Sequence, residues 1–302
     1  MRRNLLSDRV TLASSGDYQP QYRACVDQCA SSAHTLPLNL RLLGWSVLDD
    51  CKYTCMQTIT QTAIETGDRI HQYHGKWPFY RIYGIQEIAS VIFSILNGLF
   101  HYKYFFQLLE IPSGFKHKNV YLGTSLCGMN AWLWSTVFHT RDLPWTEKLD
   151  YFSAGLYILY GLFLAVVRIF NPKGIWFKLW AGVCGAAYLV HVSYLSRLTR
   201  FDYGYNMLAC LIVGGIQTSI WLVWSIMNLR RRSYAWMSGV SVVLVGLAMS
   251  LEVFDFPPWL GLLDAHSLWH AATIPLAPLF YHFLLKDAYT ECSGKKLDKQ
   301  LW

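Results

Sequence analysis

The sequence predicts an all-α integral membrane protein: a seven-transmembrane helix bundle behind a small, disulfide-linked helical N-terminal domain. Of the 302 residues, 53% are hydrophobic and only 15% are charged, against about 25% charged in an average soluble domain. Aromatic residues make up 16% of the chain, which suits a protein with many membrane interfaces. After residue 81, apolar runs of about 20 residues recur, the length that a helix needs to cross the hydrocarbon core. This composition excludes a disordered chain and argues against an ordinary soluble protein.

Residues 1–80 are polar, contain four of the eight cysteines and are predicted to form a lumenal domain. The cysteines form two pairs with i, i+4 spacing, Cys25 with Cys29 and Cys51 with Cys55. On two antiparallel helices such pairs face each other, so Cys25–Cys55 and Cys29–Cys51 are the preferred links among three possible connectivities. Disulfides require an oxidising compartment such as the ER lumen. The alternative, a zinc site of four cysteines, usually has the tighter C-x2-C spacing.

Seven apolar runs follow the N-terminal domain, and helices are the sensible interpretation of them because lipid leaves the backbone no other partners. Short connections with Pro, Gly and charged residues separate the runs. The runs are Ile82–Phe100, Val120–Thr140, Leu149–Phe170, Ile175–Leu195, Tyr205–Asn228, Tyr234–Phe254 and Ser267–Leu285. Residues 81–286 are therefore the predicted membrane domain, and residues 287–302 a predicted cytosolic tail.

Lys and Arg in the connections orient the helices, because these residues collect on the cytosolic side. With the N-terminus outside, the inner connections hold most of them, including Arg230–Arg232. We therefore expect a lumenal N-terminus and a cytosolic C-terminus, and no binding of nucleic acid by these residues. A lumenal N-terminus normally follows a signal peptide, but Met1–Gln19 has no apolar core of one. Either the sequence begins after processing or at an altered start, or the first span exports the N-terminal domain.

Five polar residues converge at the lumenal level of this topology. Ser135 and His139 share one face at the end of the second span. Asp150 opens the third span, and His266 and His270 form an H-x3-H pair at the start of the seventh. Two histidines four residues apart on a helix can both reach one metal ion. Because ionisable groups are costly at membrane depth, such a cluster favours function, although an H-x3-H pair at a helix start is also compatible with ordinary interfacial residues.

Three neutral imidazoles with one open coordination position are typical of a catalytic zinc site. Bound Zn²⁺ lowers the pKa of a coordinated water to about 7 and supplies hydroxide at neutral pH. In this hypothesis His139, His266 and His270 are the zinc ligands, and Asp150 is the general base or a further ligand. Ser135 would hydrogen-bond the oxyanion or a ligand. We disfavour Ser135 as a nucleophile because no histidine is clearly spare to act as its base.

Seven longer segments of the chain also contain recognisable sequence motifs. They are Asp49–Met56, His74–Phe79, Asn130–Asp142, Thr146–Phe152, His191–Leu195, Arg200–Asn206 and Leu251–His270. Together they resemble the GPI-anchor fatty-acid-remodelling family, the post-GPI-attachment phospholipases of the secretory pathway. The resemblance extends from about residue 20 to residue 285.

That family belongs to a superfamily of seven-span membrane hydrolases that includes alkaline ceramidases and adiponectin receptors. Its shared pattern of Ser-x3-His, a later Asp and a terminal His-x3-His matches the five polar residues one for one. The resemblance implies a zinc-dependent amide or ester hydrolase. For this branch it implies phospholipase A2-type removal of the sn-2 acyl chain from protein-linked GPI anchors in the lumenal leaflet, during lipid remodelling.

Two alternatives belong to another functional class: a seven-span receptor, and a metal-ion transporter that uses the lumenal histidines for binding. A transporter would distribute its polar groups along a path through the bilayer, whereas these five residues gather at one edge. The expected location is the ER membrane, with the Golgi membrane as the alternative. The sequence predicts no oligomeric state.

Overall fold

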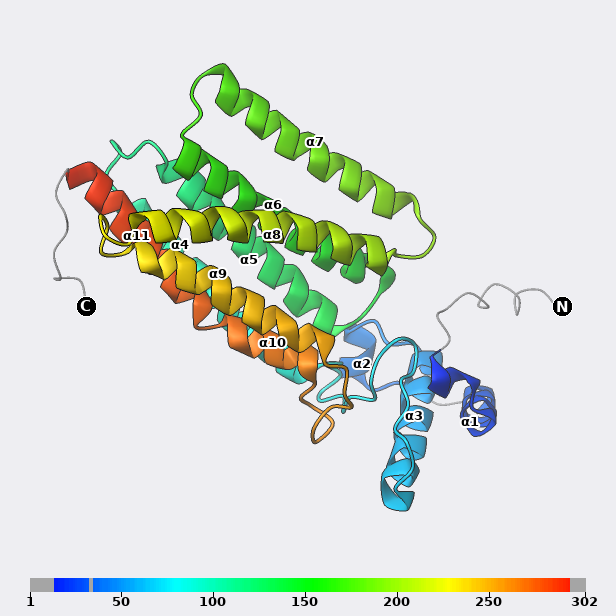
Figure 1. Cartoon of the computed structure of the whole chain (residues 1–302). Coiled ribbons are helices and arrows are strands. Elements are labelled where there is room, and N and C mark those ends of the chain that lie inside the picture. The colour runs from blue at the N-terminus through cyan, green and yellow to red at the C-terminus, as the bar shows by residue number, and fades with distance from the viewer. Residues whose placement is uncertain (1–13, 33–34, 294–302) are drawn as a thin grey trace. The chain divides into compact units, whose positions relative to one another are not determined.

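The computed structural model describes residues 14–32 and 35–293 (Figure 1). Over these residues the protein is helical, with three isolated β-bridges and no strand, which confirms the predicted all-α class. Residues 1–13, in the segment searched for a signal peptide, and residues 294–302, in the predicted tail, lie outside the described residues. The chain divides into two compact units. The head unit comprises Met1–Ala89, His139–Arg141 and Phe254–Ala265, and the bundle unit comprises Ser90–Phe138, Asp142–Val253 and His266–Trp302.

The helices of the head unit lie in its N-terminal part. They are η1 (Ser15–Tyr18), α1 (Pro20–Ser31), α2 (Leu38–Leu42) and α3 (Val47–Thr66). The ends of α3 have the expected caps: the Ser46 side chain accepts a hydrogen bond from the Asp49 N–H, and Gly67 closes the helix with a φ of 73°. A serine at the N-cap satisfies an otherwise unpaired N–H, and glycine adopts the left-handed conformation at little cost.

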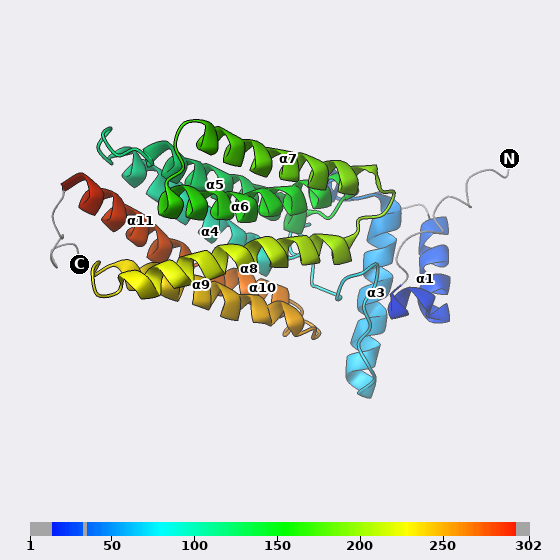
Figure 2. The same ribbon diagram turned by 45° about the horizontal axis from the view of Figure 1, so that its top comes forward.

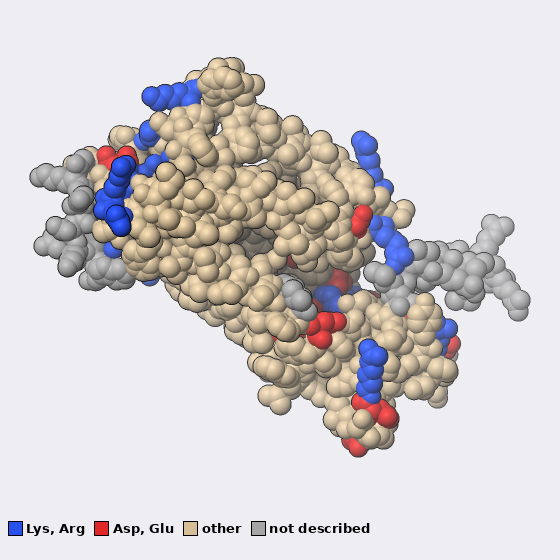
Figure 3. Space-filling view, in the orientation of Figure 1, with Lys and Arg blue, Asp and Glu red and all other residues tan. Residues whose placement is uncertain are grey.

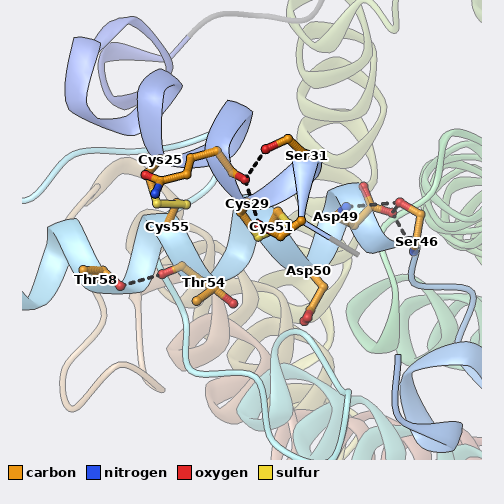
Figure 4. Close-up of a disulfide and its surroundings, with 12 residues drawn as sticks. Cys25, Cys29, Ser31, Ser46, Asp49, Asp50, Cys51, Thr54, Cys55 and Thr58 are labelled. Carbon is orange, nitrogen blue, oxygen red and sulfur yellow. Dashed lines mark hydrogen bonds between the residues drawn. A yellow bond between two sulfur atoms is a disulfide. The ribbon is translucent and has the colours of Figure 1, made fainter. Parts of the chain in front are cut away.

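Two disulfides link α1 to α3 (Figure 4). They join Cys25 to Cys55 and Cys29 to Cys51, so the predicted pairing is confirmed and the alternative zinc site of these four cysteines is wrong. Cys51 and Cys55 are fully buried, and the two bonds lie one helical turn apart. The small core beside them includes Tyr22 and Tyr73. A domain with so little apolar core gains much of its stability from cross-links.

The bundle unit contains the remaining helices (Figures 1 and 2), except for a few residues at the ends of three of them that belong to the head unit. They are α4 (Ile88–Leu109), α5 (Lys118–Thr140), α6 (Pro144–Phe170), α7 (Ile175–Arg197), α8 (Tyr203–Asn228), α9 (Ala235–Met249), η2 (Ser250–Val253), α10 (Ala265–Thr273) and α11 (Leu276–Ser293). Helix α8 packs against α6 and α9, α9 packs against α11, and α7 packs against α6. Large aromatic side chains, among them Trp221, Tyr281 and Phe283, fill the core.

The outer surface of these helices is apolar. Among the described residues, four helices are long and apolar enough to cross a membrane, namely α6, α7, α8 and the continuous stretch of α10 and α11, and α9 is a shorter apolar helix. On the face shown in Figure 3, a broad surface between the groups of Lys and Arg carries no charged side chain. The protein is therefore a membrane protein. Each of the seven predicted runs overlaps a helix, and the number of spans stays a prediction.

Two predicted spans differ from the helices observed. The first was expected to begin at Ile82, but Ile82–Ile85 is a tight turn with Tyr83 and Gly84 at positive φ, and α4 begins at Ile88. Apolar residues in the turn extended the apparent run. The last span breaks after Thr273, where Pro275 has no N–H to donate to the preceding turn. Helix α11 then continues to Ser293, beyond the boundary expected at residue 286.

A buried ionic cluster joins α5, α6 and α11 at one end of the bundle unit. Asp287 is fully buried. It accepts two hydrogen bonds from Arg168, at 2.5 and 2.6 Å, and one each from the hydroxyls of Tyr121 and Tyr234, at 2.6 and 2.9 Å. Such complete hydrogen bonding is what lets a charged pair exist away from water.

Candidate metal centre

The H-x3-H pair lies on α10, a helix of nine residues. The Nε2 atoms of His266 and His270 are 2.9 Å apart. His270 is buried, and Trp132 packs edge-on against its ring. Two imidazole nitrogens at this distance form an N–H···N hydrogen bond in which one ring donates and the other accepts. The two Nε2 atoms therefore converge on one point, as two ligands of a single metal ion must.

Helix α4 holds His270 from the other side of the ring. Ser94 Oγ lies 3.0 Å from His270 Nδ1 and 3.0 Å from Ser135 Oγ. The Asn97 side-chain amide donates a hydrogen bond of 2.9 Å to the His270 main-chain carbonyl. The structure thus connects Ser135 to His270 through Ser94. Ser94 and Asn97 were not among the predicted site residues, because their only signal in the sequence is two polar residues three apart within an apolar run.

His139, at the end of α5, is buried and belongs to the head unit. Its Nδ1 lies 2.6 Å from the Glu87 carboxylate, which also forms an ion pair with Lys76. Backbone hydrogen bonds from the N–H groups of Gln86 and Glu87 to the carbonyls of Thr140 and His139 hold the two segments together. With Nδ1 engaged by a carboxylate, Nε2 is the ring nitrogen that can serve as a ligand.

Glu87 is ionised in this environment. Burial alone would raise the pKa of its carboxyl, but the charge of Lys76 and the contact with His139 outweigh burial and hold the pKa well below its usual range. A carboxylate that accepts from the second nitrogen of a metal-binding histidine increases the basicity of the ring. Glu87 was not among the predicted site residues, although it is a lone carboxylate directly ahead of an apolar helix.

The three predicted histidines form a group that could bind a metal ion, because ring nitrogens of His139, His266 and His270 lie within 4.8 Å of one another. The donor set fits a borderline metal such as zinc: three imidazoles, with a carboxylate behind one and a hydroxyl behind another. Asp150 lies in the second turn of α6 and is half-buried. Its role as base or ligand stays a prediction.

Comparisons with known proteins agree with the resemblance found in the sequence. Residues 37–288 match the model of the Per1-like family. The chain is 40% identical to the GPI-specific phospholipase A2-like PGAP3 of Xenopus laevis, over 92% of each chain, and 40% identical to that of Homo sapiens, over 94% of this chain and 93% of the relative. It is 41% identical to the PER1 homolog of Schizosaccharomyces pombe, over 92% of this chain and 88% of the relative.

No solved structure matches the chain significantly. The family match covers most of the described residues and includes every residue of the candidate centre. The relatives match the chain along nearly its whole length. The protein therefore belongs to the Per1-like family.

Proposed function

We propose that the protein is a zinc-dependent hydrolase that removes the sn-2 acyl chain from protein-linked GPI anchors. The observation that carries this proposal is the group of three histidines in a chain whose curated relatives are named GPI-specific phospholipase A2-like. Family membership supports a GPI-remodelling protein with hydrolase activity more than it supports a receptor or an ion transporter. The zinc ion and the sn-2 position are the additional steps of the proposal.

The residues of the chain divide the work of ester hydrolysis. His139, His266 and His270 hold the metal through neutral imidazole nitrogens, and Glu87 orients the first of these rings. Bound zinc supplies Lewis acidity, which activates water at neutral pH and polarises the acyl carbonyl. Asp150 accepts the proton of the attacking water and returns it to the departing glycerol oxygen. The ester C–O bond breaks, and the products are a free fatty acid and a lyso-GPI.

Ser135 stabilises the negative charge that develops on the carbonyl oxygen. A buried hydroxyl aimed at this oxygen contributes more than it would in water, because the surrounding dielectric constant is low. Ser135 is 6% exposed and bonded to Ser94, so its orientation is restrained before substrate arrives. We assign it this role and not that of a nucleophile, because His270, the histidine to which Ser94 links it, is assigned to the metal.

The proposed compartment is a membrane of the secretory pathway, the ER or alternatively the Golgi, with a lumenal N-terminus and a cytosolic C-terminus. The two disulfides of the head unit support a lumenal location for that unit. The proposed substrates, GPI-anchored proteins in the lumenal leaflet, carry their acyl esters near the headgroup boundary. A two-chain lipid reaches such a site from within the leaflet.

Reconstituted protein tests the proposal directly. We expect His139→Ala and His270→Ala to abolish fatty-acid release from a GPI-linked reporter and to reduce bound zinc from near one equivalent. His191→Ala, which removes an imidazole from α7, is the matched control and should retain both. If both site variants fold and release fatty acid as fast as the parent, the zinc-hydrolase assignment is wrong. Release of the sn-1 chain alone would refute the proposed position.

A further inference from the structure

Two polar side chains of α4 hold His270 at two different atoms. Ser94 is fully buried and Asn97 nearly so, in the N-terminal half of a largely apolar helix. Ser94 contacts the ring through Nδ1, and Asn97 contacts the main-chain carbonyl. Buried polar groups are costly in an apolar environment unless they are paired. Their convergence on a single histidine suggests that α4 is built to position this residue.

The carbonyl of His270 needs such a partner because α10 ends just after it. The next N–H that a regular helix would direct to it belongs to Ile274, but Ile274 bonds to Ala271 instead. Thr273 Oγ1 and the amide of Asn97 supply the missing donors, at 2.8 and 2.9 Å. The break before α11 therefore leaves His270 anchored to α4 at its backbone.

The hydrogen bonds of the ring can run in two directions. When Nδ1 carries the hydrogen, it donates to Ser94 Oγ, and the Ser94 hydroxyl donates onward to Ser135. In this direction Nε2 presents its lone pair on the side of His266, where it can accept from that ring or bind a metal ion, and the Ser135 hydroxyl hydrogen is not donated to Ser94. When Nε2 carries the hydrogen, the chain reverses: Ser135 donates to Ser94, Ser94 donates to Nδ1, and Nε2 cannot bind a metal.

We propose that Ser94 is a positioning residue that holds His270 in its metal-binding tautomer and directs the Ser135 hydroxyl outward as a donor. This inference rests on the proposed zinc centre and adds a residue outside the Ser, Asp and His pattern found in the sequence. A group behind a ligating histidine usually changes metal affinity about 10–100-fold when it is removed. Ser94 acts on both proposed functions at once, because one hydroxyl connects the ligand to the oxyanion donor.

The chain provides a matched control one helical turn away. Ser90 is on the same face of α4 and is also fully buried, but its hydroxyl has no hydrogen-bond partner in the structure. Ser94→Ala and Ser90→Ala therefore remove the same atom from equally buried positions. Ser94→Thr restores a hydroxyl at the test position and serves as the rescue variant.

The experiment measures zinc affinity of the full-length protein in detergent by competition with a chromophoric chelator. We expect Ser94→Ala to weaken binding about 10–100-fold, Ser94→Thr to recover most of it, and Ser90→Ala to match the parent. In ¹⁵N-histidine NMR of the zinc-free protein, the resonances lost in His270→Ala identify this ring. Ser94→Ala should shift them toward the Nε2–H tautomer, a readout that loss of packing alone would not change.

The possible failures are distinguishable. If the parent holds zinc through His270 but Ser94→Ala binds it as tightly, the inference about Ser94 is wrong and the metal centre stands. An equal loss in Ser90→Ala would also overturn it, because the effect would then come from helix packing. If the parent holds no zinc, the proposed function fails and the inference fails with it. Should Ser94→Thr not fold, the comparison of the two alanine variants still decides.

Discussion

Replacing Asp287 with Asn should destabilise the bundle unit more than any single change at its surface. The side chain keeps its volume but loses its charge, and the buried Arg168 keeps only the one-third exposed carboxylate of Glu291, 3.0 Å away, as a counter-ion. Two tyrosine hydroxyls also lose their strong acceptor. Breaking a buried ion pair by removing one partner costs about 3–5 kcal/mol. For a chain of this size we expect the melting temperature in detergent, followed by tryptophan fluorescence, to fall by roughly 10 °C.

The same cluster supplies the control. Glu291 pairs with Arg232 at 2.6 Å and with Arg168 at 3.0 Å, but its own side chain is about one-third exposed and Arg168 keeps the buried Asp287, so Glu291→Gln should cost at most about 1 kcal/mol. The double variant Arg168→Met with Asp287→Asn should be more stable than Asp287→Asn alone, because it contains no unpaired buried charge. If Asp287→Asn costs no more than Glu291→Gln, or if the double variant is less stable than the single one, the reasoning is refuted.

Three further predictions concern the head unit. Replacing Cys29 and Cys51 together by Ser removes the inner of two nested disulfides, with a sequence separation of 22 inside one of 30, and should cost at most about 3 kcal/mol of unfolding free energy; an unchanged denaturant midpoint for the head unit would contradict this. Glu87→Gln should weaken zinc binding about 10–100-fold by removing the carboxylate behind His139, and an unchanged affinity in chelator competition would exclude that role. Burial lowers the pKa of the His74 ring, and this effect outweighs the attraction of Asp17. Folding therefore favours the neutral ring, so the folded state loses stability as the pH falls below about 6.5, where the ring of the unfolded chain takes up a proton. Limited proteolysis at pH 7 and pH 5.5 should show faster cleavage at the lower pH, and His74→Asn should abolish the difference if the assignment is correct.

Periodicity and spacing predicted the parts of the fold that depend on local sequence. The i, i+4 cysteine pairs favoured the observed disulfides among three possible connectivities, because two antiparallel helices present such pairs in register. The apolar runs located the helices, but they could not show that Ile82 lies in a turn, since hydropathy does not distinguish an apolar turn from the start of a helix. The break at Pro275 was visible in the sequence but its consequence was not, because proline is tolerated in membrane helices whose neighbours supply hydrogen bonds.

Some residues of the candidate centre could be predicted from the sequence, and others could not. Ser135, His139, His266 and His270 belong to short patterns on single helices, and their chemistry could be inferred from spacing. Glu87 and Ser94 lie 52 and 176 residues from the histidines that they contact. Neither residue belongs to a local pattern, so only the folded structure shows that they support the centre.

The ionic cluster also has a consequence for how the chain is made. Arg168 and Asp287 are 119 residues apart, so a ribosome synthesises Arg168 long before its counter-ion. Until α11 is added, the nascent chain has a guanidinium at the end of α6 without its final partner. Because α11 supplies the counter-ion, a chain that stops before Asp287 leaves the Arg168 guanidinium without the carboxylate that binds it. The two ends of this buried pair can therefore meet only after α11 has been synthesised.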